Sequence, residues 1–230
     1  MDRAKTNRQL ALPFLLPYLV YVGLASIPEE WLRLEANYAL RLVVVGGLVG
    51  CSWRYYLPLR GPYSRMLSCF TGAAAGMAGV LVWILATEIL VGSGGEPWSL
   101  PAYYLRVASA VLLVPIFEEQ LIRGFVLRFV LQWQEAKAAG AEDPFHEAWA
   151  NRSVTEVEPG AISGWSVAIS TLVFAAGHGL AEMPGAVLYG LLMCGLWHWR
   201  RDLLSCVVAH AATNLALAWY VRAYGEWALW

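Results

Sequence analysis

Charged residues are scarce in this chain. They make up 14% of its 230 residues, whereas a typical soluble domain carries about 25%. Hydrophobic residues make up 59%, more than a soluble domain of this length can bury. The net charge is −1, and no basic stripe is interleaved with aromatics, so nucleic acid is not expected as a partner. The composition indicates an integral membrane protein whose outer surface contacts the lipid bilayer.

Cysteine is also infrequent, and its spacing excludes the usual cysteine frameworks. The four residues all fall in apolar segments, and no pair has C-x-x-C spacing: Cys51, Cys69, Cys194 and Cys206. We therefore expect small buried hydrophobic side chains rather than disulfides or a zinc-binding framework.

Apolar segments are present in abundance, and a membrane-spanning helix needs about 20 such residues. Candidates lie at 10–27, 38–57, 69–91, 104–131, 161–180, 183–199 and 203–221. The first is not expected to be a cleaved signal peptide, because Pro13 and Pro17 interrupt it. The fourth is longer than one span, and Pro115 predicts a kink in it. The predicted fold is an all-α, polytopic transmembrane helical bundle of seven or eight spans, forming a single domain over 1–230.

Basic residues are distributed unevenly between the ends of these segments. One set of ends carries Arg3, Lys5, Arg8, Arg54, Arg60, Arg65, Arg200 and Arg201, and the other set is poor in basic residues. The positive-inside rule places the basic ends, and with them the N-terminus, in the cytoplasm. The one long polar stretch, about 132–160, is then predicted to be a cytoplasmic surface loop.

Two adjacent glutamates lie inside the fourth apolar segment, at Glu118 and Glu119. Carboxylates at membrane depth are costly, so they indicate a functional site by default. On a helix, Glu119 and Arg123 are at i,i+4 in the order that favours an ion pair. Glu118 is rotated by about 100° from Glu119. The sequence therefore predicts a structural carboxylate at Glu119 and a free one at Glu118.

Two histidines lie in the fifth and seventh segments. His178 closes the fifth and is flanked by Gly177 and Gly179, whereas His210 and Asn214 are at i,i+4 on one face of the seventh. A carboxylate and a histidine can activate water, and a histidine with an asparagine amide can stabilise an oxyanion.

These blocks resemble a known family signature. The patterns E-E-x-x-x-R, F-x-x-x-H and H-x-x-x-N follow in that order on separate predicted helices. They are similar to those of the CPBP (CAAX protease and bacteriocin-processing) intramembrane endopeptidases, which include the Rce1-like and Abi proteins. The resemblance covers about 111–219, within a predicted catalytic core at about 104–221. A weaker resemblance is to the CAAX-protease-related proteins found beside bacterial exosortases.

The resemblance implies an intramembrane endopeptidase that hydrolyses a peptide bond near the membrane surface. By the family pattern, Glu118 with His178 activates the water, His210 and Asn214 form the oxyanion site, and the Glu119–Arg123 pair holds the geometry. It implies no cofactor, a membrane-associated peptide or protein substrate, and a location in a bacterial inner membrane. We expect the active-site cavity to open laterally or to the cytoplasm.

Two alternatives stay open. Glu118, His178 and His210 are also of the types that bind zinc, which predicts a zinc-dependent peptidase on the same fold. The second alternative is a non-catalytic immunity or scaffold protein that sequesters a membrane peptide. A transporter with a proton relay is disfavoured, because the sequence has no inverted repeat.

Other polar or small residues receive structural interpretations. Arg41 and Arg106 lie near segment ends, and we expect their side chains to extend to the membrane interface. Gly72, Gly76 and Gly79 have the small-x-x-x-small spacing that predicts close helix packing.

Overall fold

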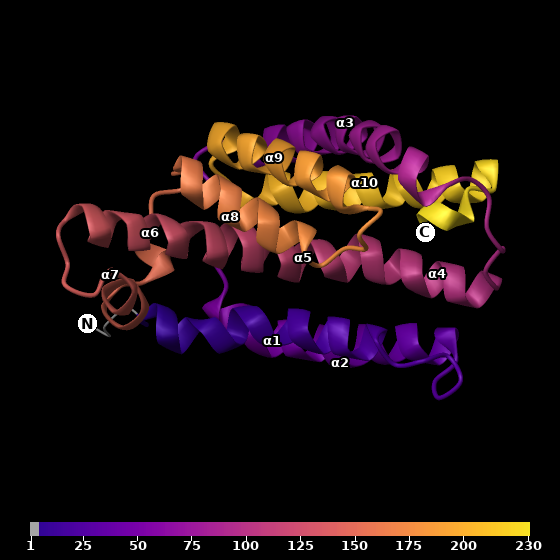
Figure 1. The fold of residues 1–230 in the computed structure, drawn as a ribbon, viewed down its shortest axis with the longest axis horizontal. Coiled ribbons are helices and arrows are strands. Elements are labelled where there is room, and N and C mark those ends of the chain that lie inside the picture. Colours follow the sequence, from indigo (N-terminus) through magenta and orange to yellow (C-terminus); the bar gives the residue numbers. More distant parts are fainter. Residues whose placement is uncertain (1–4) are drawn as a thin grey trace.

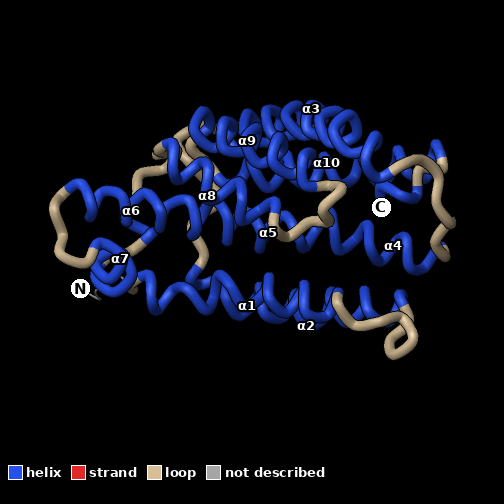
Figure 2. The backbone as a smooth tube through the Cα atoms, in the orientation of Figure 1, coloured by secondary structure: helices blue, strands red, loops and turns tan. Residues whose placement is uncertain are grey.

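The computed structural model describes residues 5–230, apart from the side chain of Ile89, and this part of the chain consists of helices and connecting loops without any strand (Figure 2). Arg3, one of the residues behind the predicted orientation, lies outside it. The main helices are α1 (Asn7–Ala25), α2 (Leu34–Ser52), α3 (Arg65–Val91), α4 (Leu100–Ala108), α5 (Val114–Glu119), α6 (Leu127–Ala138), α7 (Pro144–His146), α8 (Gly164–Ala175), α9 (Met183–Arg200) and α10 (Leu203–Tyr224). Short 3-10 turns occupy Trp53–Tyr55, Val154–Glu156 and Trp227–Leu229.

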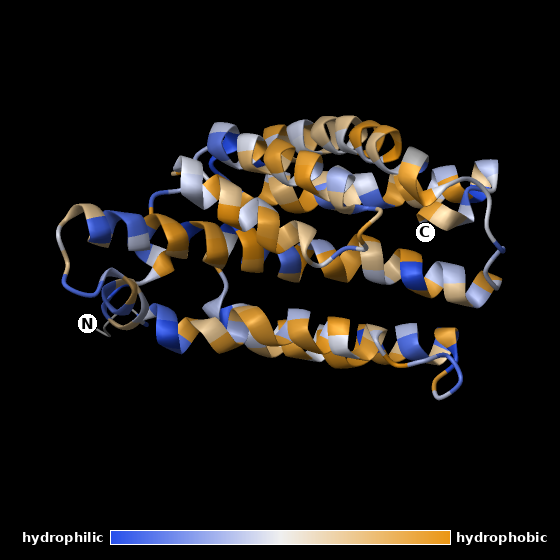
Figure 3. Cartoon of the chain, in the orientation of Figure 1, coloured by the Kyte–Doolittle hydropathy of each residue, from blue (hydrophilic) through white to orange (hydrophobic). Residues whose placement is uncertain are grey.

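The helices form a bundle whose members run along one long axis (Figure 1). α4, α5 and α6 follow one another as a single central rod. The α1–α2 pair packs on one side of this rod, and α8, α9, α10 and α3 lie on the other. Hydrophobic residues dominate the lengths of the helices, and hydrophilic ones gather mainly near the two ends of the bundle (Figure 3). This distribution is typical of a bundle that crosses a bilayer.

Each of the seven predicted segments contains a helix, and the all-α prediction is confirmed. Within residues 5–230, five helices are long and apolar enough to cross a membrane: Asn7–Ala25, Leu34–Tyr55, Arg65–Glu88, Leu100–Ala138 and Leu203–Tyr224. The two remaining segments form shorter or less apolar helices. α9 has 18 residues, and α8 has 12, which is only about 18 Å at 1.5 Å per residue.

α8 is shorter at both ends than its predicted bounds of 161–180, whereas the fourth segment, predicted at 104–131, is longer at both ends, at Leu100–Ala138. The start of α8 is set by Ser163, whose hydroxyl accepts from the Ser166 N–H while the Ser166 hydroxyl accepts from the Ser163 N–H. It ends in a tight turn in which the His178 N–H donates to the Ala175 carbonyl, 3.0 Å. The glycines at 177 and 179 disfavour continuing the helix. The helix α8 therefore ends inside the bundle and does not reach the far end of the bundle.

The central rod contains two π-helical stretches, Ser109–Leu113 and Gln120–Val126, on either side of α5. Pro115 follows the first of them. Proline has no N–H to donate, and its ring crowds the preceding turn; the wider π-helical turn accommodates it and the rod continues as one 39-residue helix. π-helical turns are frequent at functional sites, and here they bracket the two glutamates.

α3 and α10 pack closely through the predicted glycines. A Cβ atom on Gly76 would lie 2.5 Å from the Ala209 carbonyl oxygen, and one on Gly72 would lie 2.6 Å from the Ser205 carbonyl oxygen. The Thr213 hydroxyl donates to the Gly76 carbonyl, 2.9 Å. The small-residue prediction is confirmed, and this contact sets the position of the helix that carries His210.

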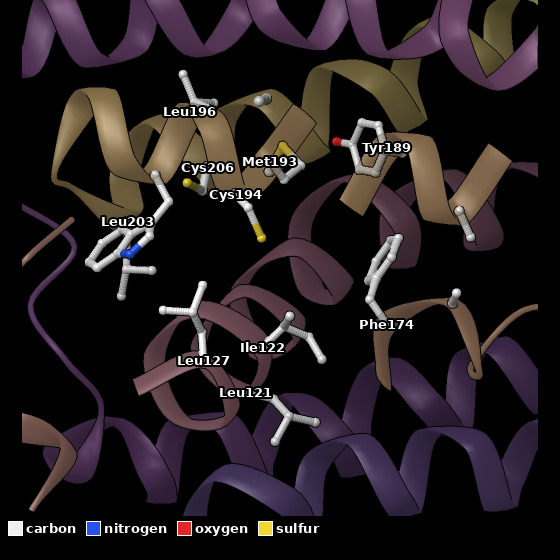
Figure 4. Close-up of a cluster of buried hydrophobic side chains, with 14 of the residues drawn as sticks. Leu121, Ile122, Leu127, Phe174, Tyr189, Met193, Cys194, Leu196, Leu203 and Cys206 are labelled. Carbon is white, nitrogen blue, oxygen red and sulfur yellow. The ribbon is translucent and has the colours of Figure 1, made fainter. Parts of the chain in front are cut away.

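The hydrophobic core lies on both sides of the central rod, and its larger part is on the α8–α10 side. Figure 4 shows side chains from the rod facing side chains from α8, α9 and α10: Leu121, Ile122, Leu127, Phe174, Met193, Leu196 and Leu203. Cys194 and Cys206 belong to this core, as predicted. Cys51 and Cys69 are exposed on the outer face of the bundle, so the prediction of burial was wrong for these two.

The polar stretch 132–160 is more ordered than a surface loop. Residues up to Ala138 continue α6, and the remainder folds back onto the start of α1. There the buried Asn7 amide donates to the Gln132 side chain and to the Ala148 carbonyl, 2.7 and 2.8 Å, and accepts from the Val154 N–H. This network fixes the N-terminal end of the bundle.

Candidate active site

Glu119 and Arg123 form the ion pair that their spacing predicts. The guanidinium Nη1 lies 3.3 Å from Glu119 Oε1, and both side chains are completely buried. Arg123 also donates from Nη2 to the Gly190 carbonyl on α9, 3.2 Å, and stacks over the Phe174 ring of α8. A buried charge pair is stable only with good geometry and further hydrogen bonds. The pair thus ties the central rod to α8 and α9.

His210 lies between the two glutamates. Its Nδ1 is 3.1 Å from Glu119 Oε1, and its Nε2 is 3.8 Å from Glu118 Oε2. A carboxylate can only accept, so the Nδ1 atom carries a proton and donates it to Glu119. The sequence assigned His210 to the oxyanion site and did not predict this contact. The ring edge at Nε2 faces the free carboxylate.

Glu118 differs from its neighbour as the helical rotation predicts. It pairs with no arginine among residues 5–230, and 14% of its side chain is exposed, compared with none of the Glu119 side chain. That exposure is to the cavity described below, which Glu118 lines. Glu118 is therefore the carboxylate that water can reach.

His178 is oriented by its own turn. Its Nδ1 lies 3.0 Å from the Phe174 carbonyl oxygen, and its ring packs between the rings of Trp83 and Phe174 at 5.2 and 4.8 Å. Because a carbonyl only accepts, Nδ1 carries the proton of the neutral imidazole. Nε2 then holds a lone pair. No direct hydrogen bond joins His178 to Glu118, although both line one cavity.

Asn214 is held against the first π-helical stretch. Its Nδ2 donates to the Ala110 carbonyl, 2.7 Å. In a π-helical turn this carbonyl would accept from the residue five positions on, which is Pro115 and has no N–H. The asparagine amide therefore satisfies the acceptor that the proline leaves free. One amide N–H of Asn214 stays available, as the oxyanion prediction requires.

All four predicted catalytic residues line one cavity of about 470 Å³, a volume within the usual range of ligand sites. Glu118 comes from α5, His178 from the turn after α8, and His210 and Asn214 from α10. The cavity begins where α8 stops short, because the neighbouring helices continue past its last turn. The early end of α8 thus creates the space.

The cavity extends toward one end of the bundle. Its outer lining includes Leu34 at the start of α2, Glu182 before α9, and the C-terminal Trp230. The start of α2 and the C-terminus lie toward the end opposite to the N-terminus and the α9–α10 turn, whereas the start of α9 lies further inside the bundle (Figure 1). Under the predicted orientation this opposite end would be the non-cytoplasmic end, so the predicted orientation and a cavity that opens to the cytoplasm are not compatible with each other. The lateral opening stays a prediction.

Several aromatic residues that line the cavity were not predicted, and two of them lie beside the histidines. Trp83 of α3 and Tyr189 of α9 line the cavity, and Tyr189 packs edge-on against His210 with ring centroids 5.9 Å apart. The Tyr189 hydroxyl is buried without a hydrogen-bond partner among the described residues. Aromatic residues are frequent throughout this sequence, so nothing distinguished these two before the helices were assembled.

A zinc site needs several ligand side chains that converge on one point. Within residues 5–230, His, Cys, Asp and Glu side chains form no group of three or more that is arranged to hold a metal ion. Glu118, His178 and His210 share the cavity but do not form such a group.

Comparison with known proteins identified one family. The family model described as type II CAAX prenyl endopeptidase Rce1-like matches residues 100–216, just over half of the chain. The matched range runs from α4 into α10 and contains every predicted catalytic residue. No curated protein and no solved structure matched the chain.

Proposed function

Because the chain belongs to the Rce1-like type II CAAX prenyl endopeptidase family, we propose that it is an intramembrane endopeptidase that hydrolyses a membrane-associated peptide with water activated by Glu118 and His178. The observation that carries this proposal is the convergence of Glu118, His178, His210 and Asn214 on one cavity from three separate parts of the chain. Water and a peptide carbonyl can both enter such a cavity.

The surroundings of each group suggest its role. The Glu118 carboxylate and the unprotonated Nε2 of His178 are the two proton acceptors, and a water between them would lose its proton on attacking the carbonyl carbon. The remaining amide N–H of Asn214 and an Nε2–H of protonated His210 would donate to the developing oxyanion. The proton taken from water would finally pass to the leaving amine. Glu119 and Arg123 would position His210 without touching substrate.

The proposed location is a bacterial inner membrane with the N-terminus in the cytoplasm. No cofactor is part of this proposal. Integral membrane placement itself follows from the family and from the five long apolar helices.

The proposal is tested with purified protein in lipid nanodiscs and a pool of apolar peptides, with products identified by mass spectrometry. We expect the wild type to cleave, and Glu118→Gln and His178→Ala to reduce turnover by about 100-fold or more, with unfolding temperatures close to wild type. Glu142→Gln and His146→Ala, in the polar segment after α6, are the matched controls and should retain full activity.

Normal turnover in the Glu118→Gln and His178→Ala variants would overturn the mechanism. The metal alternative is tested by measuring bound zinc in the purified protein and its activity after a chelator is added. Stoichiometric zinc together with loss of activity on chelation would show that the enzyme is a zinc peptidase instead. Peptide binding without cleavage by any variant, wild type included, would favour the scaffold alternative.

A further inference from the structure

Two arginines line the same cavity at its outer part, on helices from opposite parts of the chain. They are Arg41 of α2 and Arg106 of α4. Arg41 is 6% exposed, so it is buried rather than extended to the membrane interface as its sequence position predicted. Arg106 is half-buried. Both arginines therefore line the cavity that the catalytic groups share.

Aromatic rings hold both guanidinium groups in place. Arg41 lies over the rings of Tyr21 and Tyr38, at 5.0 and 4.4 Å, and its Nε donates to Asn37 Oδ1. Arg106 lies between the rings of Trp98 and Trp230, at 4.9 and 4.5 Å. Cation–π contacts orient a guanidinium without neutralising its charge.

Neither arginine has a carboxylate partner. Among residues 5–230, the ion pairs of arginine involve residues 33, 123, 152 and 200, and include neither Arg41 nor Arg106. The acids that line the cavity are Glu118 and Glu182, and the Glu182 carboxylate accepts from the Gly179 N–H, 2.8 Å. Unpaired cations at membrane depth are costly and usually serve an anion or a transport path.

We propose that Arg41 and Arg106 form a subsite that binds a carboxylate of the polypeptide substrate, at a fixed distance from the hydrolytic groups. Guanidinium is the side chain best matched to a carboxylate, which it can bind through two parallel hydrogen bonds. The subsite rests on the proposed peptidase function for its purpose, but its ligand chemistry follows from the two guanidinium groups alone.

The helix that carries both Arg106 and Glu118 sets the distance between the proposed subsite and the hydrolytic groups. The two residues are 12 positions apart on one continuous rod, which is about 18 Å at 1.5 Å per residue. An extended peptide spans that distance in about five residues. The geometry therefore favours substrates with a carboxylate about five residues from the scissile bond, either at the C-terminus or on an acidic side chain.

The test measures binding, separately from cleavage, in the Glu118→Gln protein reconstituted in phosphatidylcholine nanodiscs. The probes are one short apolar peptide with a free C-terminal carboxylate, the same peptide with a C-terminal amide, and the amide with an internal glutamate. We expect both carboxylate peptides to bind about tenfold more tightly than the plain amide. Arg41→Gln and Arg106→Gln should each remove this preference.

Arg33→Gln is the matched control, because Arg33 is an exposed arginine at the same end of the bundle and should leave the preference unchanged. Arg106→Gln is informative even where Arg41→Gln fails to fold, because Arg106 is only half-buried and makes no ion pair with a described residue. Equal binding of acid and amide peptides would overturn the subsite. So would a preference that survives in Arg106→Gln.

Cleavage with the wild type separates this inference from the proposed function. Hydrolysis that needs Glu118 but is indifferent to the carboxylate would refute the subsite and leave the peptidase standing. Carboxylate-dependent binding in a protein that never cleaves would refute the peptidase and leave the subsite standing. Moving the carboxylate along the peptide should give the highest cleavage at a spacing of about five residues.

Discussion

At the scale of single residues, the two adjacent glutamates differ in what surrounds them. Glu119 is completely buried between Arg123 and His210, whereas Glu118 borders the cavity. Removing one partner of a buried ion pair leaves the other charge without compensation, and this costs about 3–5 kcal/mol in soluble proteins. Substitution of Glu119 should therefore affect mainly the stability of the protein, and substitution of Glu118 mainly its catalytic activity.

We expect Glu119→Gln to lower the free energy of unfolding strongly, because Arg123 loses its carboxylate, and Glu118→Gln to leave it nearly unchanged. Thermal unfolding of both variants in the same detergent measures the difference. The two substitutions are chemically identical and adjacent, so each is the control for the other. A Glu118→Gln protein that unfolds at a lower temperature than Glu119→Gln would contradict this division.

The sequence predicted part of this arrangement. The Glu119–Arg123 pair could be predicted because i,i+4 spacing is local to one helix. The contact between His210 and Glu119 joins residues 91 positions apart, and only helix packing brings them together. The same reason applies to Arg41, which looked like an interfacial residue until α2 was placed against the α4–α6 rod.

At the scale of elements, the α3–α10 contact determines where His210 lies. A Cβ on Gly76 would lie 2.5 Å from the Ala209 carbonyl oxygen, next to His210 in the chain, whereas a Cβ on Gly47 of α2 would meet nothing within 4 Å. Both glycines are inside helices, where alanine is favoured intrinsically by about 1 kcal/mol. Comparing alanine substitutions at Gly76 and Gly47 therefore separates the effect of helix packing from the effect of helix propensity.

We expect Gly76→Ala to lower the unfolding temperature and to reduce peptide cleavage, because α10 must shift and carry His210 away from the glutamates; overpacking of this kind costs about 1–3 kcal/mol. Gly47→Ala should be neutral or slightly stabilising. Unfolding temperature and cleavage rate are measured on both variants. Equal behaviour of the two would show that the close contact does not position the site.

Hydropathy predicted where helices occur but not where α8 ends. The residues after Ala175 continue as Ala, Gly, His, Gly, Leu and Ala, which remain mostly apolar, so an apolar window extends to about residue 180. Helix termination depends instead on local hydrogen bonds and on glycine, and the early end of α8 is what opens the cavity. The existence of the site could be predicted from motifs, but its shape could not.

At the scale of the whole molecule, the direction of the cavity and the distribution of basic residues have to be considered together. The cavity runs toward the end that holds Leu34 and Trp230, and Arg60, Arg65 and Arg201 lie at the opposite end. Under the positive-inside rule the basic end is cytoplasmic. Substrates would then enter from the non-cytoplasmic side, and the direction of entry depends entirely on this orientation.

Single cysteines test the orientation in intact bacterial cells. In a variant whose four native cysteines are replaced by alanine, we expect Glu96→Cys, in the α3–α4 connection, to react with a membrane-impermeant maleimide added outside. Glu142→Cys, in the segment between α6 and α7, should react only after the cells are lysed, because the charged reagent cannot cross the bilayer. Both positions are in loops at the two ends of the bundle, so lysed cells provide the labelling control for each. The reverse labelling pattern would show that the topology is inverted. The cavity, which holds the hydrolytic groups at its inner end, would then open to the cytoplasm.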